Sequence, residues 1–310
     1  MYQEVTIQLT EKCNISCPYC FAPIKSERML STEDFDMFAE FCKLSSPDVI
    51  HVTGGEPSLN PNFGNYVSRL ASLASLVIYS NFTTANMIDD IRTSVPSEVV
   101  FLLNTNGSDF CSERERENVN FNLNNALSKG YRVALSHTFY SSAISLEDTF
   151  SLLLNQMAKY EIGQLRISQA IAFNDATIGL NREKIKELYH YVAGNIKDWR
   201  LKGFKVYFDC PVPPCYVDAR DFKVLRENRA VSVKCLPKVF VMWNLDVTHC
   251  YSTMDEPELK KLTSFNSLLS AREYSTKLLL KKQRQSSRTG CHVCYYGSDG
   301  IPCGCPSYCV

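Results

Sequence analysis

Short apolar runs alternate with helix-like stretches between Val5 and Trp199, and this alternation limits the folds open to the chain. The runs are rich in Val, Ile, Leu and Tyr, which is typical of buried strands. They lie at Val5–Leu9, Asp48–Thr53, Leu76–Tyr79, Glu98–Leu103, Tyr131–Ser136 and Gln164–Ser168. Six strand-then-helix units predict an α/β protein with a parallel sheet, either an open doubly wound sheet or a partial barrel.

Helix starts are marked by residues that commonly cap helices. Ser31 and Ser145 each stand three positions before an aspartate, and Asn181 opens a run with apolar residues at helical spacing. Cys42 falls on the apolar face of the first of these helices, which predicts a buried thiol. His137 alternates with apolar residues in its strand, which predicts packing against helices rather than catalysis.

The composition excludes several classes of protein. Hydrophobic residues make up 45% of the 310 residues, so the chain can bury a sizeable core and is not disordered throughout. Lys and Arg (33) balance Asp and Glu (33), so no net charge favours nucleic acid or an anionic membrane. The sequence has no signal-peptide core and no apolar run of about 20 residues. We therefore expect a cytoplasmic protein without nucleic-acid or membrane partners.

The 14 cysteines are distributed unevenly. Three lie near the start, nine lie from Cys210 onward, and a single cysteine lies between residues 43 and 209. The chain thus divides into a cysteine-poor body, residues 1–200, and a cysteine-rich extension, residues 201–310. Without a secretory signal, metal binding or redox chemistry is a better interpretation than a disulfide framework, which is kept as the lesser alternative.

The first cysteines form a Cys-x3-Cys-x2-Cys triplet, Cys13, Cys17 and Cys20, directly after the first predicted strand. Three thiolates on one loop can bind three irons of a 4Fe–4S cluster, and the fourth iron then has no protein ligand. An open coordination position is what a catalytic metal centre needs. The alternative is a zinc site that is completed elsewhere in the chain.

A second motif, Gly54-Gly55-Glu56-Pro57, ends the second predicted strand. Two glycines at the end of a strand allow the backbone to approach a ligand closely, and Glu56 can accept a hydrogen bond from an ammonium group. An ordinary Gly-Gly turn with an exposed glutamate is the alternative. The motif gains weight because it follows the cysteine triplet.

Together, the triplet and the glycine motif resemble the signature of the radical S-adenosylmethionine (SAM) superfamily. The resemblance covers roughly residues 1–200 and implies a partial (β/α)6 TIM-like barrel. It implies that Cys13, Cys17 and Cys20 hold a 4Fe–4S cluster, whose open iron is chelated by the methionine amino and carboxylate groups of SAM. It further implies that the Tyr19 backbone lies along the adenine and that Gly54, Gly55 and Glu56 hold the methionine ammonium.

The chemistry that the resemblance implies is reductive cleavage of SAM to a 5′-deoxyadenosyl radical, which then abstracts a hydrogen atom. A flavodoxin- or ferredoxin-type protein would supply the electron. Polar residues at strand ends would surround SAM in such a barrel: Ser80, Asn81, Asn104, Ser136, Arg166 and Ser168. Arg166 could pair with the SAM carboxylate, or it could form an ordinary ion pair at the rim.

The extension contains a predicted hairpin, with runs at Val239–Trp243 and Val247–His249 around a turn at Asn244–Asp246. We expect metal bound to its cysteines to stabilise the fold of this extension. The pattern resembles the SPASM extension of radical SAM enzymes, which binds two auxiliary 4Fe–4S clusters. We assign Cys291, Cys294, Cys303 and Cys309 to one cluster, and Cys235, Cys250, Cys305 and either Cys210 or Cys215 to the other.

The extension departs from the family pattern. Leu245 stands where the family's hairpin has a glycine, and the spacing around Cys303 is irregular. A single auxiliary cluster, as in a twitch domain, and a structural zinc site are therefore kept as alternatives. One cysteine would be left over, and Cys210 and Cys215 are the candidates for a thiol that donates a hydrogen atom to a substrate radical. A spare buried thiol is the other interpretation.

Families that join this barrel to such an extension mostly modify ribosomally made peptides, by cross-linking, thioether formation or epimerisation, so a precursor peptide is the expected substrate. A basic run could dock an acidic leader, although such a run is more often a solvated helix face: Arg272, Lys277, Lys281, Lys282, Arg284 and Arg288. No leader-binding domain precedes the predicted barrel, so recognition would use an edge strand, a partner or the extension. A small-molecule substrate and a non-catalytic iron–sulfur or zinc protein are the alternatives, and RNA modification is less favoured.

Overall fold

The computed structural model describes residues 3–20, 25–170, 178–211, 213–232, 235–236, 238–254, 256 and 259–285. These fall into two compact units. The first comprises Met1–Cys17, Ala22–Val133 and Pro237–Leu279, and the second comprises Pro18–Phe21, Ala134–Leu236 and Leu280–Val310. Cys291, Cys294, Cys303, Cys305 and Cys309 lie outside the described residues, so their predicted cluster assignments are not tested.

The first unit contains a sheet in the order β10-β9-β8-β1-β2-β3-β4. Strands β1 to β4 are parallel, and β8 pairs with β1 in parallel as well. Strands β8, β9 and β10 pair antiparallel. The bounds are β1 Glu4–Gln8, β2 Val49–Thr53, β3 Ser75–Ser80, β4 Val99–Asn104, β8 Val239–Val241, β9 Asp246–Thr248 and β10 Lys260–Lys261.

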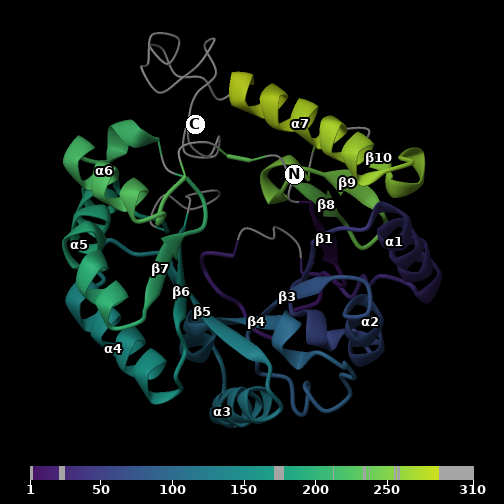
Figure 1. Ribbon diagram of the computed structural model, residues 1–310, viewed down its shortest axis with the longest axis horizontal. Helices are drawn as coiled ribbons and strands as arrows, with labels where there is room; N and C mark the ends of the chain where they lie inside the picture. Colours follow the sequence, from purple (N-terminus) through teal and green to yellow (C-terminus); the bar gives the residue numbers. More distant parts are fainter. Residues whose placement is uncertain are drawn as a thin grey trace. The chain divides into compact units, whose positions relative to one another are not determined.

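Helices α1 (Thr32–Ser45) and α2 (Phe63–Leu70) cover one face of the parallel strands (Figure 1). Side chains alternate across a strand, so the covered face collects the fully buried apolar residues, among them Ile7, Ile50 and Ile78. The Phe35 and Tyr66 rings stack 3.8 Å apart between the two helices. The unit also contains α3 (Glu113–Ser128) and most of α7 (Leu268–Gln285).

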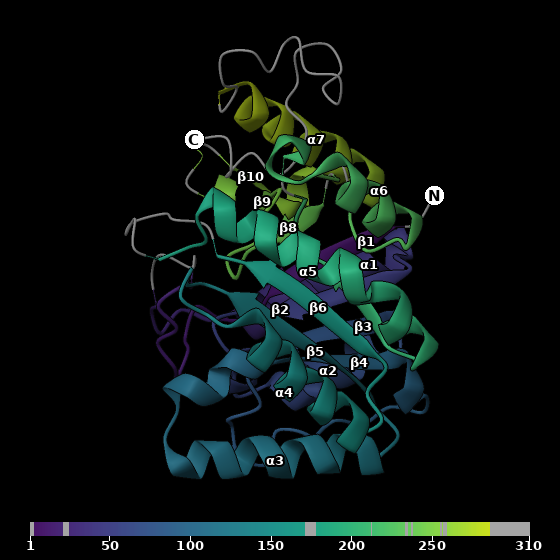
Figure 2. The same cartoon turned by 90° about the vertical axis from the view of Figure 1, so that its left-hand side faces the viewer.

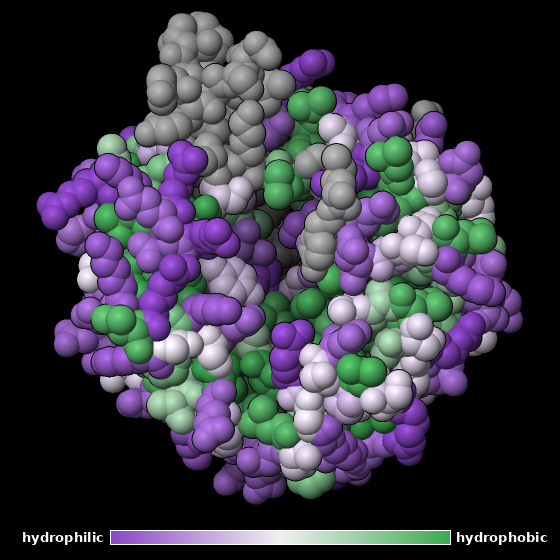
Figure 3. Space-filling view, viewed as in Figure 1, coloured by the Kyte–Doolittle hydropathy of each residue, from purple (hydrophilic) through white to green (hydrophobic). Residues whose placement is uncertain are grey.

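The second unit contains a parallel sheet in the order β5-β6-β7, with β5 and β6 side by side in Figure 2. Its elements are β5 (Arg132–Phe139), α4 (Leu146–Lys159), β6 (Gln164–Gln169), α5 (Arg182–Leu201), β7 (Lys205–Phe208) and α6 (Ala219–Glu227). Hydrophilic side chains predominate on the part of Figure 3 over α5 and α6, as expected for helices with one solvent face.

Short 3₁₀ turns complete the described structure. They lie at Pro57–Leu59, Pro96–Glu98, Thr105–Phe110, Pro214–Tyr216, Tyr251–Thr253 and Leu262–Ser264. Among the helices that the structure describes, none is both long and apolar enough to span a bilayer.

Most local predictions are confirmed. All six predicted strands form, and the predicted caps Ser31, Ser145 and Asn181 accept hydrogen bonds from the backbone of their helices. The hairpin forms as β8 and β9, and Cys42 is fully buried. Burial lowers the pKa of His137 to about 4, consistent with its predicted packing. The seventh strand of the parallel series, β7, and the pairing of β8 with β1 were not predicted, since that pairing joins residues far apart in the sequence.

Candidate functional site

The segment that enters Cys13 lies against the end of β2. Leu9 N–H donates to the Thr53 carbonyl at 2.8 Å, and Gly55 N–H donates to the Thr10 carbonyl at 2.8 Å. Glu56 N–H then donates to the Lys12 carbonyl at 2.8 Å. The cysteine loop and the glycine motif, about 40 residues apart in the sequence, are thus joined backbone to backbone.

The two glycines of the motif are required by this approach of two backbone segments. A Cβ atom on Gly55 would lie 2.3 Å from the Lys12 carbonyl oxygen, and one on Gly54 would lie 2.9 Å from the Thr10 carbonyl oxygen. Real Cβ atoms do not approach a backbone oxygen so closely, so only glycine fits. The sequence interpretation assigned the glycines to contact with a ligand, and the structure adds a second reason for them.

Glu56 is buried, with 1% of its surface exposed, and joins β2 to β3. Its Oε1 accepts from Ser58 N–H (3.1 Å), from Ser58 Oγ (2.6 Å) and from Ser80 Oγ (2.9 Å). Its Oε2 accepts from Asn81 N–H at 2.8 Å. Burial raises the pKa of Glu56, and these hydrogen bonds oppose the rise. Three of these donors share Oε1 and one reaches Oε2, so Oε2, with about two lone pairs, can accept a further hydrogen bond.

The residue after Cys13 is held by side chains from two other elements. Asn14 Oδ1 accepts from Asn81 Nδ2 at 3.2 Å. Asn14 Nδ2 donates to Thr83 Oγ1 at 2.6 Å and to Glu115 Oε1 at 3.0 Å. Asn81 therefore contacts Glu56 through its backbone and the cysteine loop through its side chain, and both Ser80 and Asn81 lie where the sequence predicted, at the end of β3.

Two asparagines of α3 support the loop that follows β3, and sequence reasoning did not identify them. Asn122 Nδ2 donates to the carbonyls of Phe82 (2.9 Å) and Thr84 (2.7 Å), and Asn118 Nδ2 donates to the Thr83 carbonyl (2.9 Å). Phe82 has a φ of 61°, an unfavourable conformation for a side chain of its size. The only sign of Asn118 and Asn122 in the sequence is their four-residue spacing, which places them on one helix face.

The thiols of the triplet have the chemistry of metal ligands. Cys13 and Cys17 are half-buried, and burial raises the pKa of the Cys13 thiol to about 11. A bound cation would offset this effect and stabilise the thiolate. Cys20 is exposed and belongs to the second unit. Within the described part of the chain, no three His, Cys, Asp or Glu side chains are close enough together to hold a metal ion. The donor set fits an iron–sulfur cluster, and the assignment stays a prediction.

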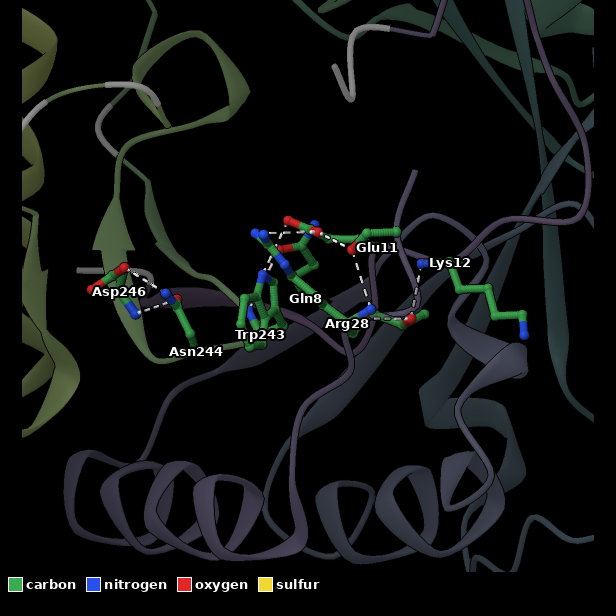
Figure 4. Close-up of polar contacts among 9 residues, drawn as sticks. Gln8, Glu11, Lys12, Arg28, Trp243, Asn244 and Asp246 are labelled. Carbon is green, nitrogen blue, oxygen red and sulfur yellow. Dashed lines mark hydrogen bonds and ion pairs between the residues drawn. The ribbon is translucent and has the colours of Figure 1, made fainter. Parts of the chain in front are cut away.

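A further polar cluster lies at the start of the cysteine loop and was not predicted (Figure 4). Trp243, at the tip of the β8–β9 hairpin, donates from Nε1 to Glu11 Oε1 at 3.0 Å. The Arg28 guanidinium lies over the Trp243 ring, 5.5 Å from its centroid. Gln8 Oε1 accepts from Trp243 N–H at 3.4 Å. The hairpin of the predicted extension is therefore anchored on the segment that leads into Cys13.

Candidate residues of the second unit have protein partners of their own. Arg166 and Ser168 share a face of β6, as predicted, but Arg166 forms an ion pair with Asp209. The Cys210 thiol lies 3.7 Å from Asp209 Oδ2. Cys210 and Cys215 are exposed, so the interpretation of either as a spare buried thiol is wrong. Ser136 is 8% exposed.

The other predicted residues have varied surroundings. The Tyr19 ring lies 5.0 Å from that of Tyr140. Asn104 accepts from Asn106 N–H at 3.2 Å and caps the 3₁₀ turn after β4. Cys235 and Cys250 are half-buried. Their assignment to an auxiliary cluster stays a prediction.

Residues 7–110, which contain the triplet, the glycine motif and the ends of β3 and β4, match the Radical SAM superfamily. This chain contains a radical SAM domain. The family uses a 4Fe–4S cluster together with SAM. The matched segment ends before β5 and, apart from Pro18–Phe21, lies within the first unit.

The relatives place this domain among enzymes with different substrates. GTP 3′,8-cyclase of Campylobacter lari is 22% identical over 197 residues, which cover 60% of this chain and 61% of the cyclase. PqqA peptide cyclase of Gluconobacter oxydans is 33% identical over 86 residues, which cover 27% of this chain and 23% of that protein. The chain thus spans less than two thirds of the length of either relative.

The fold is that of solved radical SAM enzymes. The structure of Streptococcus suis SuiB bound to the precursor peptide SuiA has a TM-score of 0.62 and 12% identity, with 88% of this chain and 65% of SuiB covered. SuiB bound to SAM gives a TM-score of 0.67, with 97% and 72% covered. The predicted α/β class and the partial TIM-like barrel are confirmed by this likeness.

Proposed function

We propose that this protein is a radical SAM enzyme that abstracts a hydrogen atom from a ribosomally made precursor peptide. The observation that carries the proposal is the backbone pairing of the segment entering Cys13 with Gly55 and Glu56, inside the matched domain. The thiolates of Cys13, Cys17 and Cys20 would hold the 4Fe–4S cluster, which with SAM supplies a 5′-deoxyadenosyl radical. The protein's part is to position these groups and to exclude water.

The residues around the cysteine loop act mainly by fixing its position. Asn14 and Asn81 tie the loop to the end of β3, and Glu56 ties β3 to β2. Gly54 and Gly55 let the loop lie against β2. We also propose that several residues contact SAM: Tyr19, Ser80, Asn104, Ser136, Arg166 and Ser168, together with Glu56.

Two similar proteins support a peptide substrate. SuiB, which shares the fold, is solved with a precursor peptide, and PqqA peptide cyclase matches part of the domain. We include residues 201–310 as an extension that binds one or two auxiliary clusters. Its proposed ligands are Cys215, Cys235, Cys250, Cys291, Cys294, Cys303, Cys305 and Cys309. A cytoplasmic setting and a flavodoxin- or ferredoxin-type electron donor complete the proposal.

A small-molecule substrate is the second candidate. The match to GTP 3′,8-cyclase extends over 197 residues, more than twice the 86 residues matched to the peptide cyclase. Both candidate functions use the same radical chemistry, and they differ only in the substrate from which the radical abstracts a hydrogen atom.

The shared chemistry is tested by reconstituting the full chain with iron and sulfide under anaerobic conditions and adding SAM and dithionite. We expect 5′-deoxyadenosine from the wild-type protein and none from Cys17→Ala. Cys111→Ala is the matched control, because Cys111 is also half-buried but lies outside the triplet. If the wild-type protein binds iron but releases no 5′-deoxyadenosine, the proposal is wrong.

The substrate is tested by coexpression with short peptides encoded beside the gene, and separately by incubation with GTP. A peptide that loses two hydrogen atoms indicates cross-linking, and one that gains solvent deuterium without other mass change indicates epimerisation. Turnover of GTP alone would favour the second candidate. Iron analysis counts the clusters, since three clusters need about 12 Fe per chain and two need about 8.

A further inference from the structure

Three titratable side chains lie on the face of the first unit's sheet opposite α1 and α2. Glu4 comes from β1, His51 from β2 and Tyr79 from β3. His51 is in register with Thr6 on one side and with Val77 on the other, so Glu4 and Tyr79 each lie two residues along the neighbouring strands, in opposite directions. Side chains two apart share a face, and the three therefore form a diagonal line across three strands.

Contacts join the line at both nitrogens of the imidazole. His51 Nδ1 lies 3.1 Å from Tyr79 Oη. His51 Nε2 lies 3.4 Å from Glu4 Oε2. The Nε2 atom is buried and has no hydrogen-bond partner among the described residues. A buried polar atom without a well-aligned bond needs an explanation, and proton transfer in a functional site is one.

The charges around this line favour an ionised glutamate. The contact with the His51 side chain lowers the pKa of Glu4, burial opposes this, and the charges of His51, Lys238 and Arg272 lower it further. The lowered pKa favours the carboxylate form of Glu4. A carboxylate beside Nε2 favours the neutral tautomer with its proton on Nε2, which leaves Nδ1 to accept from Tyr79.

The line runs from near the carboxyl end of the sheet toward solvent at the opposite end. Tyr79 directly precedes Ser80 and Asn81, which contact Glu56 at the carboxyl end of the sheet. Glu4 begins β1 at the opposite end, and its side chain is 37% exposed. His51, between them, is 18% exposed.

We infer that Tyr79, His51 and Glu4 form a proton-transfer relay that carries a proton from the substrate at the carboxyl end of the sheet to solvent. The substrate proton passes to Tyr79 Oη while the hydroxyl proton of Tyr79 passes to His51 Nδ1. The Nε2 proton of His51 passes to Glu4 and then to water. No group in the relay changes its oxidation state, and one proton leaves for each one received.

This relay rests on the proposed function, because forming a new bond in a peptide by removing two hydrogens releases a proton and an electron besides the hydrogen atom that the radical takes. The electron would pass to an iron–sulfur cluster of the proposed extension, and the relay would take the proton. Tyr79 is the member that would meet the substrate. His51 and Glu4 act through it and are positioning residues.

The first experiment measures the three groups directly and does not depend on activity. The full-length protein, without its cluster, is labelled with ¹⁵N-histidine and followed by NMR across pH. In Glu4→Gln we expect the His51 ring to move away from the neutral tautomer that carries its proton on Nε2. In Tyr79→Phe we expect the ring to shift between its two neutral tautomers. Glu40→Gln and Tyr160→Phe are the matched controls. Identical His51 signals in the wild-type protein and both variants would overturn the relay.

The second experiment measures modified peptide formed per 5′-deoxyadenosine, with the peptide identified by coexpression. In Tyr79→Phe and His51→Gln we expect this ratio to fall about tenfold or more, with a changed pH profile. A purely structural role would lower both products together and leave the ratio constant, which would contradict the relay. If the wild-type protein makes no 5′-deoxyadenosine, the proposed function fails, while the NMR result still decides whether the three groups are coupled.

Discussion

The predicted site residues of the two units differ in what holds them. In the first unit, Glu56 and Asn81 bond to each other and to the neighbouring strand end and cysteine loop, and they are buried. In the second unit, Arg166 is paired with Asp209 beside an exposed thiol. Buried hydrogen bonds between neighbouring segments hold the backbone of those segments in place. An ion pair between two side chains can instead be replaced by an ion pair with a ligand. We therefore expect substitutions in the first unit to affect folding and those in the second to affect ligand binding.

Gly55→Ala tests the first half of this comparison and should have the largest effect. Its Cβ would lie 2.3 Å from the Lys12 carbonyl oxygen, which is held in place because it accepts a hydrogen bond from Glu56 N–H. We expect the free energy of unfolding to fall by at least about 3 kcal/mol, measured by urea denaturation of the cluster-free protein. Gly194→Ala is the control. Nothing lies within 4 Å of its added Cβ in α5, so it should stabilise the protein by about 0.5–1 kcal/mol. Equal effects of the two substitutions would remove the contrast.

Glu56→Gln should have the second-largest effect on stability. It replaces an acceptor of four hydrogen bonds with a group that has one acceptor oxygen and an amide that faces donors. We expect a loss of about 2 kcal/mol in the free energy of unfolding. Glu40→Gln, which removes one exposed ion pair with Lys43, should change it by less than about 0.5 kcal/mol.

The effect of Glu56→Gln should also depend on pH. Burial raises the pKa of Glu56 above its ordinary value of 4.5, so the folded protein binds this proton more tightly than the unfolded chain does. Stability then falls as pH rises from 4.5 through the raised value, and the variant lacks this fall. The stability advantage of the wild-type protein over the variant should therefore narrow as pH rises. A widening gap would mean that the four hydrogen bonds outweigh burial.

Leu245 gives a smaller test of strain within the first unit. It is buried and has a φ of 65°, at the position where the resembling family has glycine. Leu245→Ala should lose buried contacts and keep the left-handed strain, whereas Leu245→Gly loses the contacts and relieves the strain. We expect both to destabilise the protein, and glycine to be milder than alanine by about 1 kcal/mol, in paired thermal unfolding experiments. If alanine is the milder of the two, the hairpin turn is not strained.

Asp209→Asn tests the second unit and should have the smallest effect. If Arg166 can exchange Asp209 for the SAM carboxylate, removal of the competing charge should tighten SAM binding to the reconstituted protein about threefold, by equilibrium dialysis. Asp218→Asn, which breaks the exposed pair with Lys186, should leave the affinity unchanged. Weaker binding in Asp209→Asn would show that Arg166 serves only the scaffold.

The sequence predicted elements better than it predicted contacts between them. Strand and helix positions depend on the spacing of apolar residues and on caps such as Ser31 and Asn181, and these are local properties. The strand β7 follows α5 after three residues and was missed, because a run of four residues, Lys205–Phe208, is too short to show the alternation of a strand. The pairing of β8 with β1 joins Val239 to Val5, and no local pattern specifies it.

The same division applies to the candidate site. The cysteine triplet, the glycine motif and the polar ends of β3 were visible as residue types at fixed spacings. The contacts of Asn14, of the α3 asparagines and of Trp243 were not, since asparagine and tryptophan carry no distinctive signal alone. The diagonal of Glu4, His51 and Tyr79 depends on strand register, which three separate segments determine only when they pair.

The amino-acid sequence by itself determined the α/β class, six of the seven strands β1 to β7 and the thiols available to an iron–sulfur cluster, because each follows from spacing along the chain. Tertiary structure alone decided that Gly55 makes room for the Lys12 carbonyl, that Glu56 joins two strands and that Arg166 pairs with Asp209. Hydrogen bonds and steric contacts form between atoms that are near in space, and folding brings together residues that the sequence keeps far apart.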